Sequence, residues 1–440
     1  MTADPRLAER AVPLVLTGGA LAGVAAAWWF GAPEVVLLAL AAAPLALLYS
    51  YRLALPALEL ALVARALLDG AGSPLVTGGL ALAVVALAVV VLARTPGWTA
   101  PVLAVTAYLF LSAFAGSGAH GGEHTYTEAL RLVSCLSVVV VTVNAPARFD
   151  LWHVARTVQL VSLAPALLAV WQLATGTGAL NNGAVRSYGT LAHANSAAAL
   201  FALANLATFA LLLAGRRRWL DAGLLGLFLV AQISTGSIGG LVTAVVMATT
   251  YLASSAVRRA DRVLLGAAGV LLGVYAATTS RVGAQRIAEY TGDSGRDTSL
   301  EWRIQAWGNV MNAWREQPVF GHGVGATQSP TILAGHIPHN EYVRILAETG
   351  VVGLALVLGL GLWLAGRLRR AREGAPAALG LAVLTGLAVN ALAANTLLYS
   401  VSTYTALFVL AACWRLSRGE VPAPNGGRAV EEVRAKSPSR

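Results

Sequence analysis

The sequence has little charge: only 12% of its 440 residues are Asp, Glu, Lys or Arg, about half the share of an ordinary soluble domain. Lysine is almost absent, since Lys436 is the single lysine among 31 basic residues. Cysteine is scarce too, and Cys135 and Cys413 both lie in apolar runs. These absences exclude a soluble globular domain and a small domain held together by disulfides.

The usual motifs of nucleotide and metal chemistry are also missing. The chain has no P-loop, no GxGxxG after a strand, no GxSxG, no HExxH, no CxxC and no DxD pair. A nucleotide-driven enzyme is therefore not expected, and any group transfer must use a donor that is already activated. We expect no cofactor and no metal.

Long apolar sequence is what the chain has in abundance, with 57% hydrophobic residues. Runs of the length that crosses a bilayer as a helix recur from end to end. They predict an all-α polytopic integral membrane protein with about 12–14 transmembrane helices. The expected segments are 11–30, 34–50, 53–68, 74–93, 99–117, 127–144, 151–175, 191–214, 219–234, 237–256, 262–279, 345–366, 375–394 and 396–414.

Arginine sets the expected orientation and explains the net charge of +10. If the segments alternate, the arginine clusters and both termini fall on one side, which the positive-inside rule makes the cytoplasm. A nucleic-acid partner is therefore not expected. We expect a multi-pass membrane protein whose cytoplasmic clusters lie at Arg52, Arg94, Arg148, 216–218, 258–262, 367–372 and 415–418.

The opposite side then carries one long loop. Four parts follow: an N-terminal transmembrane bundle over 1–279 with short outer loops, an extracytoplasmic catalytic loop or cap over 280–344, C-terminal transmembrane helices over 345–420, and a disordered cytoplasmic tail over 421–440. Within the cap, apolar residues recur at helical spacing over 299–317. We expect an amphipathic helix lying on the membrane surface there, and a second helix that begins near His339.

Arginine on the outer side is the first candidate for chemistry. Arg186 lies in a short outer loop without an acidic neighbour, and Arg281 stands where a helix leaves the membrane. A guanidinium group in such a place suits a phosphate or a carboxylate. His336 and His339, with His322 upstream, are open to three interpretations: a metal site, a structural histidine, or a titratable group near a reacting hydroxyl.

These residues resemble a family signature. The stretch EQPVFGHGVG at 316–325, then His339 and Asn340, nine residues, and GVVG at 350–353 is similar to the O-antigen ligase and O-antigen polymerase superfamily. RSYGTLAHAN at 186–195 resembles an upstream element of the same family. Two positions depart from its pattern: Ile238 stands where many members have arginine, and Ala194 precedes Asn195 where proline is usual.

The resemblance implies an inverting, metal-independent, GT-C-like glycosyltransferase. It would move a glycan from undecaprenyl pyrophosphate to an acceptor hydroxyl on the periplasmic face of the membrane. The acceptor would be lipid A–core, in O-antigen ligation during lipopolysaccharide biosynthesis, or a second lipid-linked glycan, in polymerisation. We expect ligation, with polymerisation as the alternative. A secondary transporter is the alternative from another class.

Residue roles follow from joining that chemistry to the residues. His339 would accept the proton of the acceptor hydroxyl. Arg186 and Arg281 would stabilise the charge that develops on the pyrophosphate. Glu348 falls on the far side of the helix from His339, which favours a structural partner. The expected substrate-binding residues are Arg303, Asn340, Arg286, Tyr188 and Asn195.

Overall fold

The computed structural model describes residues 53–71, 74–94, 104–109, 111–112, 122–181, 184–215, 218–254, 257, 299–329, 337–371 and 374–418. The expected segments 11–30, 34–50 and 262–279 lie outside these residues, and 99–117 is described only in part. Arg281, Arg286 and the tail 421–440 lie outside them as well. The total number of spans and the four-part division therefore stay predictions.

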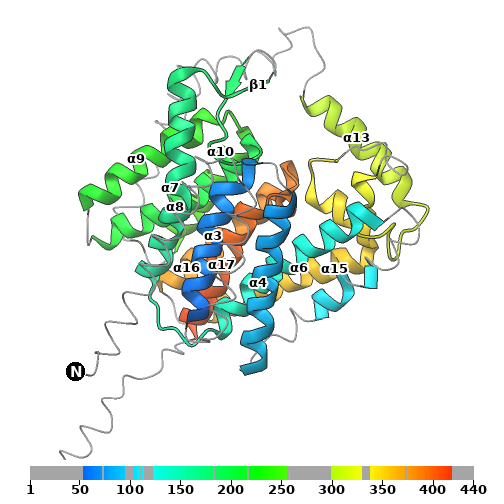
Figure 1. The fold of residues 1–440 in the computed structure, drawn as a ribbon, viewed down its shortest axis with the longest axis horizontal. Helices are drawn as coiled ribbons and strands as arrows, with labels where there is room; N and C mark the ends of the chain where they lie inside the picture. Colours follow the sequence, from blue (N-terminus) through cyan, green and yellow to red (C-terminus); the bar gives the residue numbers. More distant parts are fainter. Residues whose placement is uncertain are drawn as a thin grey trace, which may run out of the picture.

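The described residues form a helical bundle with one short hairpin (Figure 1). Its α-helices are α3 (Ala54–Leu68), α4 (Pro74–Arg94), α6 (Gly122–Asn144), α7 (Leu151–Thr175), α8 (Ala194–Ala214), α9 (Arg218–Ser234), α10 (Ile238–Ala253), α13 (Ser299–Trp314), α15 (Glu341–Arg370), α16 (Ala375–Ala393) and α17 (Ser400–Ser417). Three 3-10 turns are η2 (Asp69–Ala71), η3 (Ala326–Gln328) and η4 (Thr396–Leu398). Strands β1 (Ala179–Asn181) and β2 (Ala184–Arg186) pair antiparallel.

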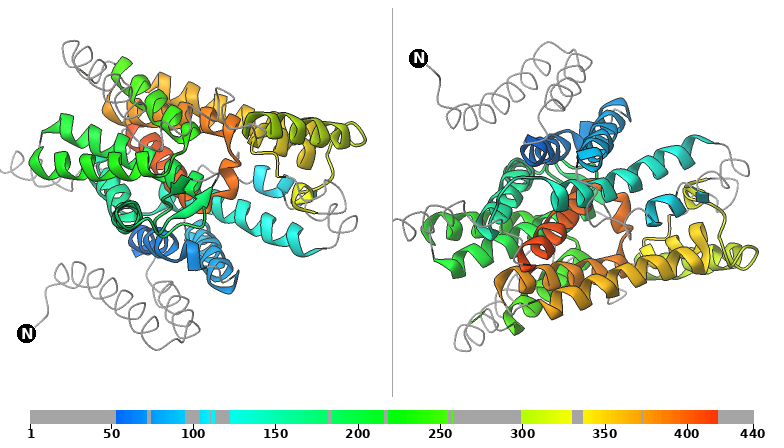
Figure 2. Two further views of the ribbon diagram at one scale, coloured as in Figure 1. Left: turned by 90° about the horizontal axis from the view of Figure 1, so that it is seen from above. Right: turned by 90° about the horizontal axis from the view of Figure 1, so that it is seen from below.

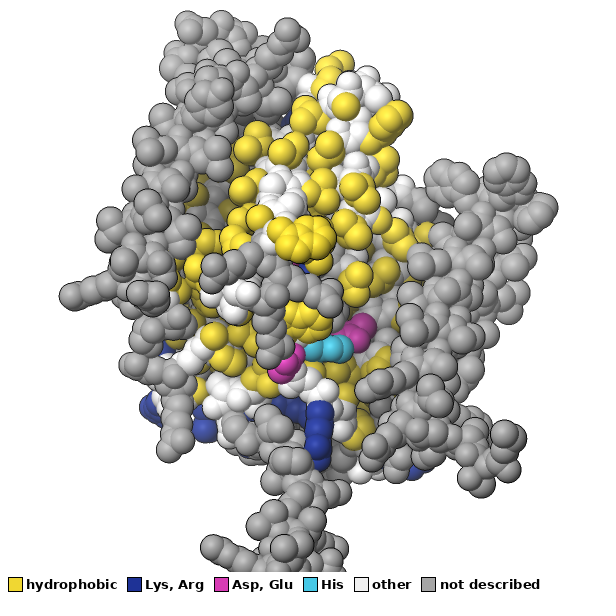
Figure 3. All heavy atoms as spheres, turned by 90° about the vertical axis from the view of Figure 1, so that its left-hand side faces the viewer, with side chains coloured by type: hydrophobic (Ala, Val, Ile, Leu, Met, Phe, Trp, Pro, Cys, Tyr) yellow, Lys and Arg dark blue, Asp and Glu magenta, His cyan; other side chains and the backbone are white. Residues whose placement is uncertain are grey.

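Helix length and composition confirm the expected fold class. Among the described residues, 6 helices are long and apolar enough to cross a membrane, and two shorter apolar ones cover Trp219–Ser234 and Ile238–Ala253. On the side of the molecule that α9 occupies, hydrophobic side chains cover much of the described surface (Figure 3). An exposed apolar surface of this extent on long apolar helices is typical of contact with lipid. The chain is a polytopic membrane protein.

Helix α17 lies in the middle of the bundle and packs against α6, α7, α8 and α16 (Figure 2). Its side chains from Ser400 to Trp414 are almost all buried. Small residues let the other helices approach closely: a Cβ atom on Gly240 of α10 would lie 2.4 Å from Ala198 of α8, and one on Gly386 of α16 would lie 2.3 Å from Met247 of α10. Close packing of small residues is the usual way in which membrane helices associate.

The two ends of the bundle differ in chemistry. At one end, Arg415 of α17 donates to the carbonyls of Thr142, Ala145 and Ala147, and Arg156 pairs with Asp221 at 2.8 Å. The last turn of α15 carries three more arginines. Because successive helices run in opposite directions through the bundle, this turn lies at the same end. At the other end, hydrogen bonds join the start of α8, the β1–β2 hairpin and the turn between α9 and α10. The candidate residues lie at this second end.

Candidate active site

Helix α13 (Ser299–Trp314) forms within the stretch 299–317 where the apolar spacing predicts a helix, and it covers the start of α15 (Figures 1 and 2). Val310 of α13 is buried against Ala347 of α15. Trp307 donates its indole N–H to the carbonyl of Pro338 at 2.5 Å, and Trp314 donates to Pro318 at 3.1 Å. The tryptophans therefore hold two later parts of the chain, at Pro318 and Pro338, against the helix.

The glycine-rich segment after α13 docks into a break in α15. Gly350 has φ 65° and ψ −171°, which interrupts the helix. The peptide groups freed there bond to the docking segment, so the break leaves them paired. The bonds run from Val351 N–H to the Pro318 carbonyl, from Val352 to Val319, from His322 to Ala347 and from Gly323 to Glu348.

Only glycine fits on either side of this junction. A Cβ atom on Gly350 would lie 2.1 Å from the carbonyl oxygen of Val319, and one on Gly321 would lie 2.5 Å from the backbone of Glu348. Both glycines also have positive φ angles, a conformation that costs a side-chain-bearing residue free energy. The glycines of the signature are thus explained by backbone packing. His322 belongs to this packing, because its Nε2 lies 2.7 Å from the Ala313 carbonyl oxygen.

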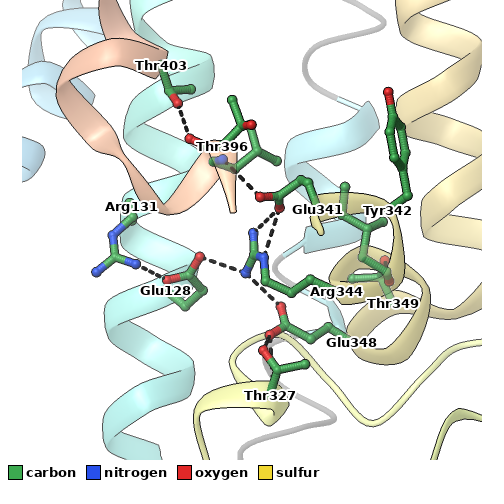
Figure 4. Close-up of polar contacts among 12 residues, drawn as sticks. Glu128, Arg131, Thr327, Glu341, Tyr342, Arg344, Glu348, Thr349, Thr396 and Thr403 are labelled. Carbon is green, nitrogen blue, oxygen red and sulfur yellow. Dashed lines mark hydrogen bonds and ion pairs between the residues drawn. The ribbon is translucent and has the colours of Figure 1, made fainter. Parts of the chain in front are cut away.

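A buried ionic cluster holds the docked segment, α6 and α15 together (Figure 4). Its centre is Arg344, whose side chain is 1% exposed. The guanidinium group contacts Glu341 at 2.5 Å, and Glu128 and Glu348 at 3.0 Å each. Arg131 pairs with Glu128 from the outer side. Three carboxylates thus surround one arginine, an arrangement that stays favourable only while every member is paired.

The cluster also reaches the loop before α17 and the docked segment. Glu341 accepts a hydrogen bond from the backbone N–H of Leu397 at 3.0 Å. Glu348 accepts from the hydroxyl and the backbone N–H of Thr327. Glu348 therefore has the structural role that its helical position favours. These bonds fix the chain on both sides of the turn at His339, because Glu341 begins the helix that follows it.

His339 lies in that turn, immediately before α15, with φ 48°. Few residues other than glycine adopt this left-handed conformation. Its ring packs against Trp302, with centroids 5.6 Å apart, and its Nδ1 is buried without a hydrogen-bond partner among the described residues. Burial first, and then the neighbouring Arg303 and His193, lower the pKa of His339 to about 4. The imidazole is therefore neutral at pH 7.

Asn340 has a clear structural task. Its side-chain oxygen accepts from the backbone N–H groups of Tyr342 and Val343 at 3.0 and 3.2 Å. This is the bonding of a helix N-cap, so Asn340 fixes where α15 begins. Its expected contact with substrate remains a prediction. The two residues of the histidine–asparagine pair thus differ in role: Asn340 caps α15, and the cap fixes the position of the His339 ring just before it.

Arg186 ends strand β2 and is buried. Its Nε donates to the carbonyl of Thr235 at 2.7 Å and its Nη2 donates to the side-chain oxygen of Asn195 at 2.8 Å. Thr235 belongs to the turn just before Ile238, the position at which many family members have an arginine. Arg186 thus brings a guanidinium group to this turn. Tyr188 makes contacts through its backbone: its N–H donates to the side-chain oxygen of Gln172 at 2.9 Å.

Two residues that the sequence did not single out complete the group. His193, the N-cap of α8, stacks on Tyr399, with ring centroids 5.9 Å apart and planes 19° from parallel. Asn195 lies within hydrogen-bonding reach of the Tyr399 hydroxyl. His193 is part of the quoted upstream element, and Tyr399 follows a polar break between two apolar runs. Neither signal indicates that the two rings meet, because 205 residues separate them in the chain.

The electrostatic interactions show which candidates come together. Arg303 acts on both His339 and Tyr399, Arg186 acts on both His193 and Tyr399, and His193 acts on His339. The site therefore joins α13, β2 and the starts of α8, α15 and α17. Arg281 and Arg286 lie outside the described residues. Within the described chain, no group of three or more His, Cys, Asp or Glu residues is placed to hold a metal ion.

Such a site has two positively charged groups, Arg186 and Arg303, and a neutral imidazole, that of His339. The arginines suit an anionic substrate, and the imidazole can accept a proton. A comparison with known protein families finds a match. The family model described as O-antigen ligase matches residues 223–358, from α9 through the docked segment into α15. A comparison with curated proteins finds no match. Residues 223–358 therefore form an O-antigen ligase family domain within a polytopic membrane protein.

Proposed function

We propose that the protein is an inverting, metal-independent glycosyltransferase that moves a glycan from undecaprenyl pyrophosphate to an acceptor hydroxyl. The proposed reaction is O-antigen ligation to lipid A–core, and polymerisation of lipid-linked glycans is the second candidate. One observation carries the proposal most directly: a neutral histidine, His339, lies at one site with Arg303 and Arg186, and both His339 and Arg303 belong to the O-antigen ligase family domain.

The arginines would act on the leaving group. As the bond between the anomeric carbon and the phosphate oxygen breaks, negative charge grows on the pyrophosphate. Arg186 is held by two hydrogen bonds, so its guanidinium group is oriented before substrate arrives. Arg303 is half-buried, and no ion pair holds it within the described chain. Fixed positive charge near a developing anion lowers the barrier more than mobile water does.

His339 would act on the acceptor. The acceptor hydroxyl attacks the anomeric carbon from the face opposite the pyrophosphate, which inverts that centre. The hydroxyl proton passes to the imidazole, the new C–O bond forms, and undecaprenyl pyrophosphate leaves. A pKa of about 4 makes His339 a weak base before substrate binds. A bound pyrophosphate anion would offset the charge of Arg303 and raise this pKa towards the working pH.

The same end of the bundle would face the periplasm. It is opposite the end at which Arg415 and the three arginines in the last turn of α15 lie, and arginine-rich ends face the cytoplasm. We therefore place both termini in the cytoplasm and the candidate site on the outer face of the inner membrane. A lipid-linked donor would then diffuse to the site within the outer leaflet.

The acceptor decides between the two candidate reactions. Purified protein in lipid is given a lipid-linked glycan and either lipid A–core or a second lipid-linked glycan. Ligation predicts a glycosylated lipid A–core and no lengthened glycan, and polymerisation predicts the reverse. Arg303→Ala should lose most of the turnover, whereas Arg315→Ala should keep it. Arg315 is a matched control because it is exposed and just beyond the end of α13. No product with either acceptor would remove the proposal.

A further inference from the structure

The ring of His193 has a defined protonation pattern. Its Nδ1 accepts a hydrogen bond from the backbone N–H of Asn195 at 3.2 Å, as the N-cap of α8. An atom that accepts from an N–H group carries no proton, so in the neutral ring the proton is on Nε2. Protonating Nδ1 would set two N–H groups against each other and break the cap.

The surroundings keep this ring neutral. Desolvation of the ring, and then the positive charge of Arg186, lower the pKa of His193. His193 in turn contributes to the lowered pKa of His339. His193 is thus a poor base, since its Nδ1 is engaged, but it is a lasting hydrogen-bond donor at neutral pH.

The direction of the donor is fixed too. The ring stacks on Tyr399 at 5.9 Å, and the Tyr399 hydroxyl is within reach of the Asn195 side chain. That side chain is held in turn by Arg186 at 2.8 Å. A backbone bond on one edge and an aromatic face below leave the ring little freedom to rotate. Among the described residues, nothing is shown to accept from Nε2.

We infer that His193, backed by Tyr399, is a substrate-binding residue that donates its Nε2–H to a phosphate oxygen of the pyrophosphate donor. The inference rests on the proposed function. An anion is favoured as the acceptor of this bond because Arg186 and Arg303 make the surroundings positive, and both act on Tyr399. His193 and Tyr399 lie outside the family-matched residues 223–358, so the bundle itself would supply this part of the site.

Two substitutions separate binding from capping. His193→Asn keeps a strong N-cap acceptor but removes the distal donor, and His193→Gln keeps a distal N–H donor but weakens the cap. The probe is undecaprenyl pyrophosphate, added to the full-length protein in detergent, with binding and thermal unfolding measured on the same samples. We expect His193→Asn to unfold as the wild type does and to bind about 10- to 100-fold more weakly, the range of a hydrogen bond to a charged group. His193→Gln should bind within about threefold of the wild type.

The outcomes distinguish this inference from the proposed function. If the wild type binds no undecaprenyl pyrophosphate, the proposed function fails. If the wild type binds it and His193→Asn binds equally well, only the role of His193 is overturned. Should His193→Asn fail to fold, His193→Ser replaces it, because serine also caps helices and has no distal donor. Inorganic pyrophosphate, used as a competitor, should show the same loss in the variant; a loss seen only with undecaprenyl pyrophosphate and not with inorganic pyrophosphate would overturn the assignment to phosphate.

Discussion

At the scale of single residues, His339 and Arg303 form the pair on which the account depends. Sequence alone singled out both, as well as Arg186 and Asn195. It could not find His193 or Tyr399, because a stack between residues far apart in the chain leaves no mark at either position. It also predicted a contact between Asn340 and the substrate, which stays a prediction, but it did not predict that Asn340 caps the start of α15. Residue type and spacing indicated the chemistry, but not which side chains meet.

The interaction between Arg303 and His339 predicts a pH effect. A base works only in its neutral form, so activity is lost as the pH falls through its pKa. In the wild type, kcat/KM, which reports the free enzyme, should fall only near pH 4, the pKa of His339. In Arg303→Gln, the loss of a positive charge raises that pKa, and the fall should move to higher pH.

The profile of kcat in the wild type should fall at a higher pH than that of kcat/KM, because bound pyrophosphate offsets the arginine charge. The control is Arg315→Gln, which should leave both profiles unchanged. Identical acid limbs of kcat/KM in the wild type and in Arg303→Gln would contradict the coupling between Arg303 and His339.

At the scale of elements, α15 differs most from what its sequence suggests. Its sequence predicts a helix that begins near His339 and continues through the apolar run 345–366. The structure places this helix at Glu341–Arg370, but breaks it at Gly350. The break depends on the docked backbone of Val319 and Phe320, which no pattern within α15 reveals. By contrast, α7 matches the predicted 151–175, because Asp150 caps its first turn and Gly176 ends it.

The break predicts the effect of a single methyl group. Gly350→Ala places a Cβ atom 2.1 Å from the Val319 carbonyl oxygen and forces alanine to a φ of 65°. We expect a loss of about 3 kcal/mol or more in stability, from strain and clash together, seen as a lower Tm. The control is Gly359→Ala in the same helix, where a Cβ atom meets nothing within 4 Å. Equal Tm values for the two variants would refute the docking.

The ionic cluster predicts a second contrast between elements. Arg344→Met leaves three buried carboxylates without their central partner and should cost about 3–5 kcal/mol. Arg131→Met removes a side chain that is 27% exposed and pairs with Glu128 alone, so it should cost about 1 kcal/mol or less. Thermal unfolding of both variants measures the contrast. A tolerated Arg344→Met would show that Arg344 does not hold the cluster together.

At the scale of the whole molecule, the bundle has an arginine-rich end and an end that holds the candidate site. Sequence predicted this separation, because hydropathy and arginine placement are properties of the whole chain. The way in which α17 comes to lie in the middle of the bundle could not be predicted, since it depends on close contacts between helices. One example is Gly380 of α16, where a Cβ atom would lie 3.1 Å from the Cβ atom of Cys413 in α17. Composition fixes which segments are helices in a membrane, and packing decides their neighbours.

The separation of the two ends predicts an accessibility pattern in cells. Cys135 and Cys413 are buried and are first replaced by alanine. A membrane-impermeant maleimide should then label Thr177→Cys, beside the hairpin, in intact spheroplasts. It should label Arg148→Cys, at the arginine-rich end, only after the membrane is opened. Labelling in the reverse pattern would invert the proposed orientation.

The most direct test of the central claim is to measure donor binding and glycan transfer on the same preparations of wild type and His339→Ala. The account predicts that His339→Ala binds undecaprenyl pyrophosphate about as tightly as the wild type. It also predicts that transfer to the acceptor falls by at least about 100-fold, the usual contribution of a general base. Full transfer activity in folded His339→Ala would contradict the account.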